Sequence, residues 1–135
     1  MKFNVRRLEE SDYETLVKWW KAWGWQPISK DFLPGQGTDG IIIFDKKIPI
    51  CAGFLYTTNS KIGWINFIVS NKEYRKKPQR KKAIILLLKS LIALCKDANI
   101  KYIYSNNNNN HLINHFESLG FNKTTDKMTE LIKII

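Results

Sequence analysis

The residues with the clearest chemical potential lie between Val69 and Leu88, where an apolar stretch runs into a dense basic segment. Six of the eight residues from Arg75 to Lys82 are arginine or lysine, and an apolar-striped helix is expected directly after them. A strand followed by a loop with free backbone N–H groups and a helix N-terminus is a ready site for a phosphate. The basic side chains add attraction for a polyanion. The segment therefore predicts a binding site for a phosphorylated ligand.

Other polar clusters are weaker candidates for chemistry. His111 and His115 lie four residues apart, about one helical turn, but no third ligand is evident, and we interpret them as surface histidines. Cys51 and Cys95 lie in apolar segments without a second Cys or His at ligand spacing. We interpret both as small buried hydrophobic side chains, and we expect no metal site.

The composition is that of one globular domain over residues 1–135, with 44% hydrophobic residues and a formal net charge of +10. This charge favours anionic partners, which include phosphorylated cofactors, nucleic acids and acidic proteins. Solvation alone would explain most lysines outside the basic segment. No apolar run approaches the roughly 20 residues of a membrane span, and the N-terminal residues lack the apolar region of a signal peptide. We expect a soluble cytoplasmic protein, either a monomer or a homodimer.

The elements before the basic segment are expected to form a helix and an antiparallel meander. Residues 2–7 alternate as a strand, and the pair Ser11 and Glu14 resembles a capping box that opens a helix over 12–23. Strands are expected over 40–44, 48–57 and 62–70, joined by turns at 45–47 and 59–61. Gly53 lies inside the second of these strands, which suggests a bulge or a close backbone approach.

Two further features of this half bear on function. Residues 26–39 form an irregular loop with one expected helical turn near 29–32. The tryptophans of the first helix recur at helical spacing, which is typical of core residues. Trp19 and Trp25 do not easily share one face with Trp20, which leaves one of them to line a pocket or an interface.

The elements after the basic segment complete an α+β fold. Helical spacing predicts a helix over 84–98 and another near 110–119, closed by Gly120, with a short strand over 101–104 between them. Further strands are expected to begin at Phe121 and to cover 129–135. The order β-α-β-β-β-α-β-α-β-β predicts a mixed, mostly antiparallel sheet of about seven strands with helices on both faces.

This order and several motifs resemble the GNAT superfamily of acetyl-CoA-dependent N-acetyltransferases. The most specific motif is N-x-x-L-x-x-x-F-E-S-L-G-F, from Asn109 to Phe121. The second is V-x-x-x-x-Y-R, from Val69 to Arg75, before a loop and a leucine-rich helix. The closing residues 128–131, together with 53–56 and 68–71, are similar to small GNAT proteins encoded by bacteriophages.

The resemblance implies acetyl-CoA as cofactor and an amine of an unknown small molecule or protein as acceptor. In relatives the fourth strand splays from the fifth and pairs with the acetyl arm of the cofactor, and the pyrophosphate lies on the loop and helix start. Asn109 is both an expected helix cap and an expected contact of the cofactor arm. The resemblance also implies that residues 26–39 and the tryptophans shape the acceptor site. The cofactor-binding residues so implied are Phe67, Ile68, Val69, Arg75, Arg80, Lys81, Lys82, Ala83, Asn109 and Phe116.

The chain departs from the family pattern at the phosphate loop. The family sequence is Q/R-x-x-G-x-G/A, and here Arg80 opens the best match, although Gln79 could also serve. Ala83 and Ile85 replace the two glycines, which normally let the backbone approach the pyrophosphate. The extra lysines could supply longer-range attraction instead, or the loop could have lost the cofactor.

The chain also departs at the expected acid and base. Phe116 replaces the tyrosine that often protonates the leaving thiolate, so bulk water, Tyr104 or a nearby serine would have to serve. Asn66 replaces a glutamate, and an amide cannot act as a base at neutral pH. Asn66 and Tyr104 are the weak catalytic candidates, and the base is unassigned. Three hypotheses follow: an N-acetyltransferase, a catalytically impaired module that binds an acyl-CoA or a protein, and a nucleic-acid-binding protein that uses residues 75–82.

Overall fold

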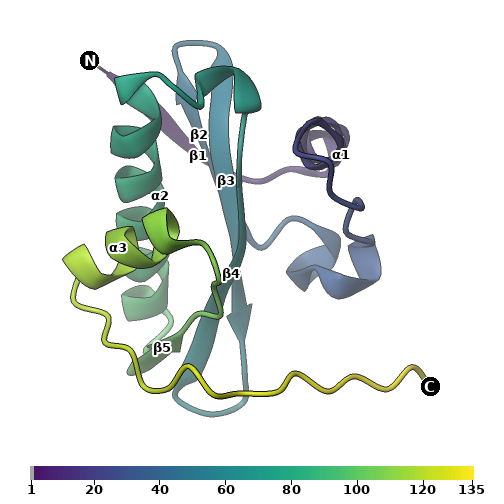
Figure 1. The fold of residues 1–135 in the computed structure, drawn as a ribbon, viewed down its shortest axis with the longest axis vertical. Helices are drawn as coiled ribbons and strands as arrows, with labels where there is room; N and C mark the ends of the chain where they lie inside the picture. The colour runs from purple at the N-terminus through teal and green to yellow at the C-terminus, as the bar shows by residue number, and fades with distance from the viewer. Residues whose placement is uncertain (1) are drawn as a thin grey trace.

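A five-stranded mixed sheet forms the centre of the computed structural model, which describes residues 2–135 (Figure 1). The spatial order is β1-β2-β3-β4-β5, antiparallel from β1 to β4, while β5 runs parallel to β4. The bounds are β1 Phe3–Arg7, β2 Gly40–Asp45, β3 Ile48–Thr57, β4 Ile62–Ser70 and β5 Tyr102–Tyr104.

Helices cover both faces of the sheet, as expected. Helix α1, Tyr13–Ala22, lies on one face, and α2, Pro78–Asp97, and α3, Asn110–Ser118, lie on the other (Figure 1). The strand alternation matches these layers, because Ile41 and Ile43 pack in the α2 cluster whereas Ile42 packs with α1. Short 3₁₀ turns are η1 Glu10–Asp12, η2 Lys30–Phe32, η3 Pro34–Gln36 and η4 Lys72–Tyr74. The turn expected near 29–32 is therefore confirmed.

The two strands expected after residue 120 are not formed, so the sheet has five strands and not about seven. Residues 121–135 contain no helix or strand. The apolar side chains of this stretch, such as Leu131 and Ile134, are each 88% exposed. A strand needs a neighbour to satisfy its backbone and to cover its apolar side chains, and the expected pairing partners do not meet here.

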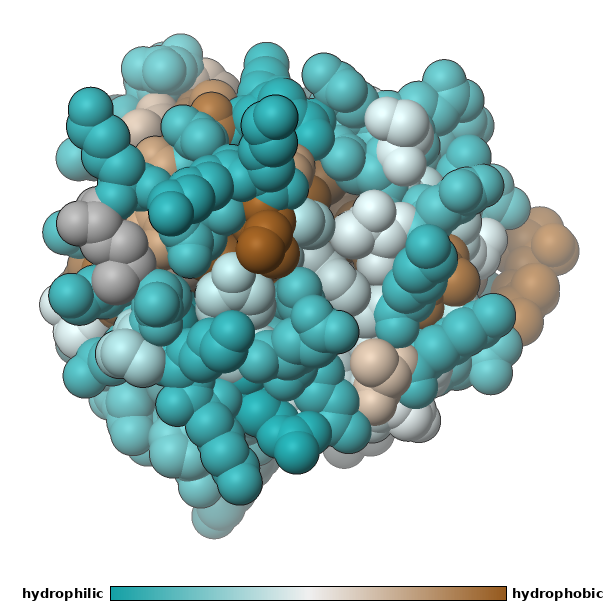
Figure 2. All heavy atoms as spheres, turned by 90° about the horizontal axis from the view of Figure 1, so that it is seen from above, coloured by the Kyte–Doolittle hydropathy of each residue, from teal (hydrophilic) through white to brown (hydrophobic). Residues whose placement is uncertain are grey.

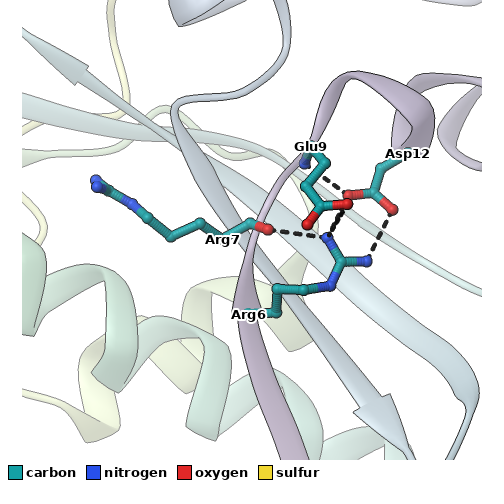
Figure 3. Close-up of polar contacts among 4 residues, drawn as sticks. All are labelled: Arg6, Arg7, Glu9 and Asp12. Atoms are coloured by element: carbon teal, nitrogen blue, oxygen red, sulfur yellow. Dashed lines mark hydrogen bonds and ion pairs between the residues drawn. The ribbon is translucent and has the colours of Figure 1, made fainter.

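The start of α1 also differs from the expected capping box. The Asp12 carboxylate accepts the backbone N–H of Glu9 at 2.7 Å, so the cap lies ahead of the expected Ser11 and Glu14 pair. The Arg6 guanidinium of β1 donates to both oxygens of Asp12, at 2.9 and 3.0 Å (Figure 3). Burial raises the pKa of Asp12, but these hydrogen bonds outweigh burial and hold that pKa below its ordinary value. The pair ties β1 to the helix that follows.

Helix α2 begins six residues before the expected position. Pro78 occupies its first turn, where the missing N–H of proline costs nothing. Residues 79–82 of the basic segment are consequently helical and not part of a loop. No helix among residues 2–135 is both long and apolar enough to cross a membrane.

Candidate functional site

The two neighbouring strands β4 and β5 separate after a short paired stretch. Only Ile62, Gly63 and Trp64 of the described β4 residues pair with β5. The next contact comes from a side chain, because the Ser105 hydroxyl donates to the Ile65 carbonyl at 2.6 Å. From residue 66 onward β4 has no β5 partner, so its backbone edge is open on that side. The splayed strands expected from the resemblance are present.

The Asn66 side chain fixes the point at which the strands part. Its Oδ1 accepts the backbone N–H of Asn106 at 3.1 Å and lies 3.5 Å from the Ser105 hydroxyl. The Trp64 indole N–H donates to the Asn106 side chain at 2.9 Å, and the Trp64 ring stacks on Tyr104 at 5.0 Å. The two weak catalytic candidates, Asn66 and Tyr104, thus lie in this fork and do not line the adjacent cleft.

A bulge in β4 lies directly beyond the fork. Ala52 pairs with Val69 and Phe54 pairs with Asn66, which leaves Phe67 and Ile68 opposite Gly53 alone. Phe67 has a φ of 57°, a left-handed conformation that is unfavourable for a bulky side chain. A methyl group on Gly53 would collide with the Ile68 side chain. The bulge expected at Gly53 is confirmed, whereas the close contact at Gly53 comes from a side chain and not from a neighbouring backbone.

A cleft of about 790 Å³ opens between the free part of β4, the start of α2 and the loop before α3. Its volume lies within the range of roughly 300–1,000 Å³ that is usual for small-molecule sites. Four cationic side chains line it, and among its described lining residues none is Asp, Glu or Tyr. The face of the molecule in Figure 2 is mostly hydrophilic, with scattered hydrophobic patches. The cationic residues are Arg75, Lys77, Arg80 and Lys81.

The start of α2 is suited to an anion. No side-chain hydrogen bond caps it, and its first turn contains no acidic residue. The N–H of Arg80 is taken by the Lys77 carbonyl, but no side-chain oxygen of the described residues accepts a capping hydrogen bond from the helix end. The partial positive charge of the helix dipole is thus left uncompensated.

The Arg80 side chain is held in place by groups from two other elements. Its Nε donates to the Ser70 hydroxyl at 3.2 Å, and its guanidinium lies 5.7 Å from the centre of the Trp23 ring. The Trp23 indole N–H donates in turn to the Ser70 carbonyl at 2.8 Å. Arg80 is therefore a pre-positioned cation and not a freely solvated one.

The cleft gathers most of the cofactor-binding residues that the sequence implied. Asn109 caps α3 through a 3.1 Å bond from the Leu112 N–H, and it also lines the cleft, so both of its expected positions coincide. Ile85, at the second glycine position, lines the cleft as well. The other implied residues at the cleft are Phe67, Ile68, Val69, Arg75, Arg80 and Lys81.

Three implied residues lie elsewhere. Lys82 is exposed and does not line the cleft, because it projects from another side of α2. Ala83 is fully buried in the core. Phe116 is only 4% exposed and packs edge-to-face on Phe121, with 4.9 Å between the ring centres. The Phe116 ring is therefore part of the core, and it offers no proton to a leaving group.

Sequence reasoning missed the histidines. His111 is exposed and His115 half-buried, in keeping with the expected surface position, but both line the cleft, which the sequence analysis did not predict. Burial lowers the pKa of His115, and the cations Lys81 and Arg80 and the neighbouring His111 lower it further. The position of the two histidines at the cleft follows from the packing of α3 beside α2. No local sequence pattern predicts that packing.

One tryptophan lines the cleft, as expected, while two others are buried in the core. Trp19 and Trp20 are buried in the α1 core cluster, whereas Trp25 is 51% exposed and lines the cleft. The Trp25 ring stacks on Trp23 at 5.8 Å. Trp25 and Phe67 thus place two exposed aromatic rings in the cleft wall.

Comparisons with known proteins establish the fold. The sequence matches no protein-family model and no curated protein. The structure resembles ribosomal-protein-S18-alanine N-acetyltransferase from Escherichia coli, with a TM-score of 0.70, 19% identity and coverage of 92% of this chain and 80% of that chain. It also resembles glucosamine-6-phosphate N-acetyltransferase from Arabidopsis thaliana, with a TM-score of 0.66, 14% identity and coverage of 98% and 100%.

A third similar structure is N-acetylglutamate synthase from Neisseria gonorrhoeae, complexed with coenzyme A and L-arginine. Its TM-score is 0.72 at 15% identity, and the match covers 95% of this chain and 29% of that one. Identities this low establish fold and not activity. The chain has the fold of the GNAT N-acetyltransferases.

Proposed function

We propose that the protein is an acyl-CoA-dependent N-acetyltransferase, which moves an acetyl group from acetyl-CoA to an amine. One observation carries this proposal: the open backbone edge of β4 adjoins the uncapped, cation-rich start of α2. The first feature suits an arm that contains amides, and the second suits a diphosphate. Coenzyme A joins these two chemical groups in one molecule.

The residues present fit such a cofactor in a definite arrangement. The main chain of residues 67–69 would hold the arm, and the α2 N-terminus with Arg80 and Lys81 would hold the diphosphate. Arg75 and Lys77 add charge at the same end of the cleft. Ile85 lines the cleft at the second glycine position of the family pattern, so side-chain cations would replace part of the close backbone contact. The bound cofactor would supply an activated acetyl thioester.

The acceptor amine would meet aromatic and amide groups. Trp25 and Phe67 line the cleft, as does the asparagine run from 106 to 109. The absence of carboxylates among the described lining residues argues against strongly cationic acceptors, because such acceptors usually require acidic partners. An amine must attack as the free base, so water is the proposed proton acceptor, and the rate should rise with pH as the amine deprotonates. A thiolate leaving group tolerates the loss of an acid at residue 116.

Calorimetry with acetyl-CoA, combined with an assay for released thiol, tests the proposal. The full chain should bind acetyl-CoA, and Arg80→Gln should weaken binding roughly tenfold or more, because it removes a pre-positioned charge-assisted contact. Absence of binding at millimolar acetyl-CoA would refute the proposed cofactor. Salt-sensitive binding of DNA or RNA in its place would favour the nucleic-acid hypothesis.

A second candidate is a module that binds an acyl-CoA without turnover. The burial of Phe116 and the lack of Asp, Glu and Tyr among the described cleft residues favour it. Binding of acetyl-CoA without thiol release across a panel of small amines and peptides would identify this case. The acceptor, the cytoplasmic location and the likeness to bacteriophage proteins stay predictions.

A further inference from the structure

Aromatic side chains from three neighbouring strands line up on the α1 face of the sheet. Tyr56 on β3 pairs with Trp64 on β4, and Trp64 pairs with Tyr104 on β5. Paired residues project to the same face of a sheet, as do residues two apart on one strand, so Tyr102 shares this face. Tyr56 packs against the α1 core cluster, whereas Ile103, between the two tyrosines of β5, packs against the α2 cluster. These four residues, Tyr56, Trp64, Tyr102 and Tyr104, form what we call the aromatic row.

The β5 end of the aromatic row is open to solvent. Tyr102 is 62% exposed and Tyr104 is 43% exposed, although aromatic side chains usually contribute to a core. Helix α1 lies on the same face but at a distance from β5 (Figure 1), and Trp64, Tyr102 and Tyr104 belong to neither hydrophobic cluster of the described chain. The Trp64 ring is nonetheless held in place, because its N–H donates to the Asn106 side chain and Tyr104 stacks on it. Core packing therefore does not account for these rings, which form an ordered and accessible surface.

Lysines flank the exposed end of the aromatic row. The carbonyl of Lys61, in the turn before β4, accepts the N–H groups of Lys101 and Tyr102 at 2.9 and 3.1 Å. Both lysine side chains are exposed. Residues 57–70 and 98–116, which contain β4 and β5, include no aspartate or glutamate. Together with the net charge of +10, this local excess of positive charge favours a polyanionic partner.

We propose that the aromatic row binds single-stranded nucleic acid. Tyr102 and Tyr104 project from positions two apart on β5, roughly 6.6 Å along the strand, and bases would stack on their rings. Lys61 and Lys101 would contact the adjacent phosphates. Sheet faces with exposed aromatic residues bind about two or three bases in this manner. Such stacking tolerates any base sequence, because every base has a π-face.

This surface differs from the basic segment 75–82. The aromatic residue beside that segment, Tyr74, is 5% exposed, so it cannot stack on a base. The aromatic row supplies the accessible rings that the basic segment lacks. None of its four residues lines the cofactor cleft, so nucleic acid and acetyl-CoA would bind at different places. Nucleic-acid binding at the aromatic row is therefore independent of the proposed acetyl transfer.

Fluorescence anisotropy with labelled oligouridine and oligothymidine tests the proposal, at a length of about 12 nucleotides, which lies within the usual site sizes. Both oligonucleotides should bind the full chain with dissociation constants of roughly 1–100 µM. A duplex of the same length should bind more weakly, because its bases are already stacked on one another. Acetyl-CoA should displace neither oligonucleotide, because it would occupy the cleft.

Substitutions separate stacking from charge. Tyr102→Ala should weaken oligonucleotide binding roughly fivefold or more, because it removes a stacking ring, and Tyr102→Phe should retain binding. Lys61→Gln with Lys101→Gln should reduce the slope of log affinity against log salt by about 1.4, or about 0.7 for each lost phosphate contact. The control Trp25→Ala removes an exposed ring of the cleft and should leave oligonucleotide binding unchanged. Circular dichroism should be the same for all variants, because the substituted side chains are exposed.

Three results would overturn the proposal. The first is the absence of oligonucleotide binding at about 100 µM protein, the weak end of the usual non-specific range. The second is displacement of the oligonucleotides by acetyl-CoA, which would place them in the cleft. The third is equal affinity for duplex and single strand together with unchanged binding by Tyr102→Ala, which would show attraction by charge alone.

Discussion

Arg80 combines a cationic head group with contacts that restrict its motion before any ligand arrives. Ser70 on β4 and Trp23 after α1 both contact it, so three elements determine one guanidinium position. A pre-positioned side chain loses less conformational entropy on binding than a solvated lysine does. We therefore expect Arg80 to contribute more to ligand affinity than any of the neighbouring lysines.

Lys81 and Lys82 provide a matched pair on adjacent positions of α2. Lys81 lines the cleft and Lys82 does not. Lys81→Gln should weaken acetyl-CoA binding roughly two- to fivefold, which is typical for an exposed ion pair, and Lys82→Gln should have little effect. Calorimetry at low ionic strength measures both. Equal losses in the two variants would indicate a general charge effect and not a defined site.

His115 predicts a pH dependence of cofactor binding. Its pKa in the free protein is lowered by burial and by the cations Lys81 and Arg80. A bound polyanion would raise that pKa, so binding would take up a proton and affinity would gain as the pH falls through the pKa of His115 in the complex, until the free protein is protonated as well. His115→Asn should lose this gain when compared with wild type at each pH. Parallel affinity profiles would show that His115 does not sense the ligand.

At the scale of elements, the fork between β4 and β5 depends on a side chain where backbone pairing stops. Asn66→Leu removes the acceptor for the exposed Asn106 N–H and should cost about 0.5–1.5 kcal/mol of stability, with weaker cofactor binding because β4 is no longer held open. Asn66→Asp retains the acceptor oxygen and should preserve binding. Denaturation and calorimetry together check both variants. Loss of binding in Asn66→Asp but not in Asn66→Leu would contradict a positioning role.

The junction between β1 and α1 predicts an acid-sensitive contribution to stability. The folded-state pKa of Asp12 lies below its ordinary value of 3.8, so its stabilisation is present above that value and is lost as pH falls through the folded pKa. Asp12→Asn should lower the free energy of unfolding at pH 7 by about 1–3 kcal/mol. The difference from wild type should shrink in acid, as urea unfolding would show. Glu10→Gln, an exposed acid of the same turn, is the control and should have no such effect.

At the scale of the whole molecule, local patterns predicted the meander well. Strands β3 and β4 begin and end at the expected residues, because turn residues and alternating apolar positions are properties of neighbouring residues. The start of α2 was missed because residues 78–82 contribute no apolar periodicity. The position of His115 at the cleft was not predicted because it depends on how α3 packs on α2, which no local pattern encodes.

The C-terminal strand was expected from composition, and composition alone does not supply a pairing partner. Residues 129–135 have the β-branched character of a strand, yet no neighbour within the described chain satisfies their backbone. Strand formation depends on a distant edge as much as on intrinsic preference. The sequence therefore identifies the segment, but the partner has to come from the three-dimensional arrangement.

The bulge at Phe67 turns the β4 main chain out of its ladder, and this has a consequence for how the protein can evolve. Peptide groups are the same for every amino acid. A strand that binds a ligand through its peptide groups therefore constrains the backbone conformation more than the identity of the side chains. Mutations can then accumulate along such a strand as long as the kink survives. A site made of main-chain groups is thus compatible with the low identity, at most 19%, between this chain and the three similar structures.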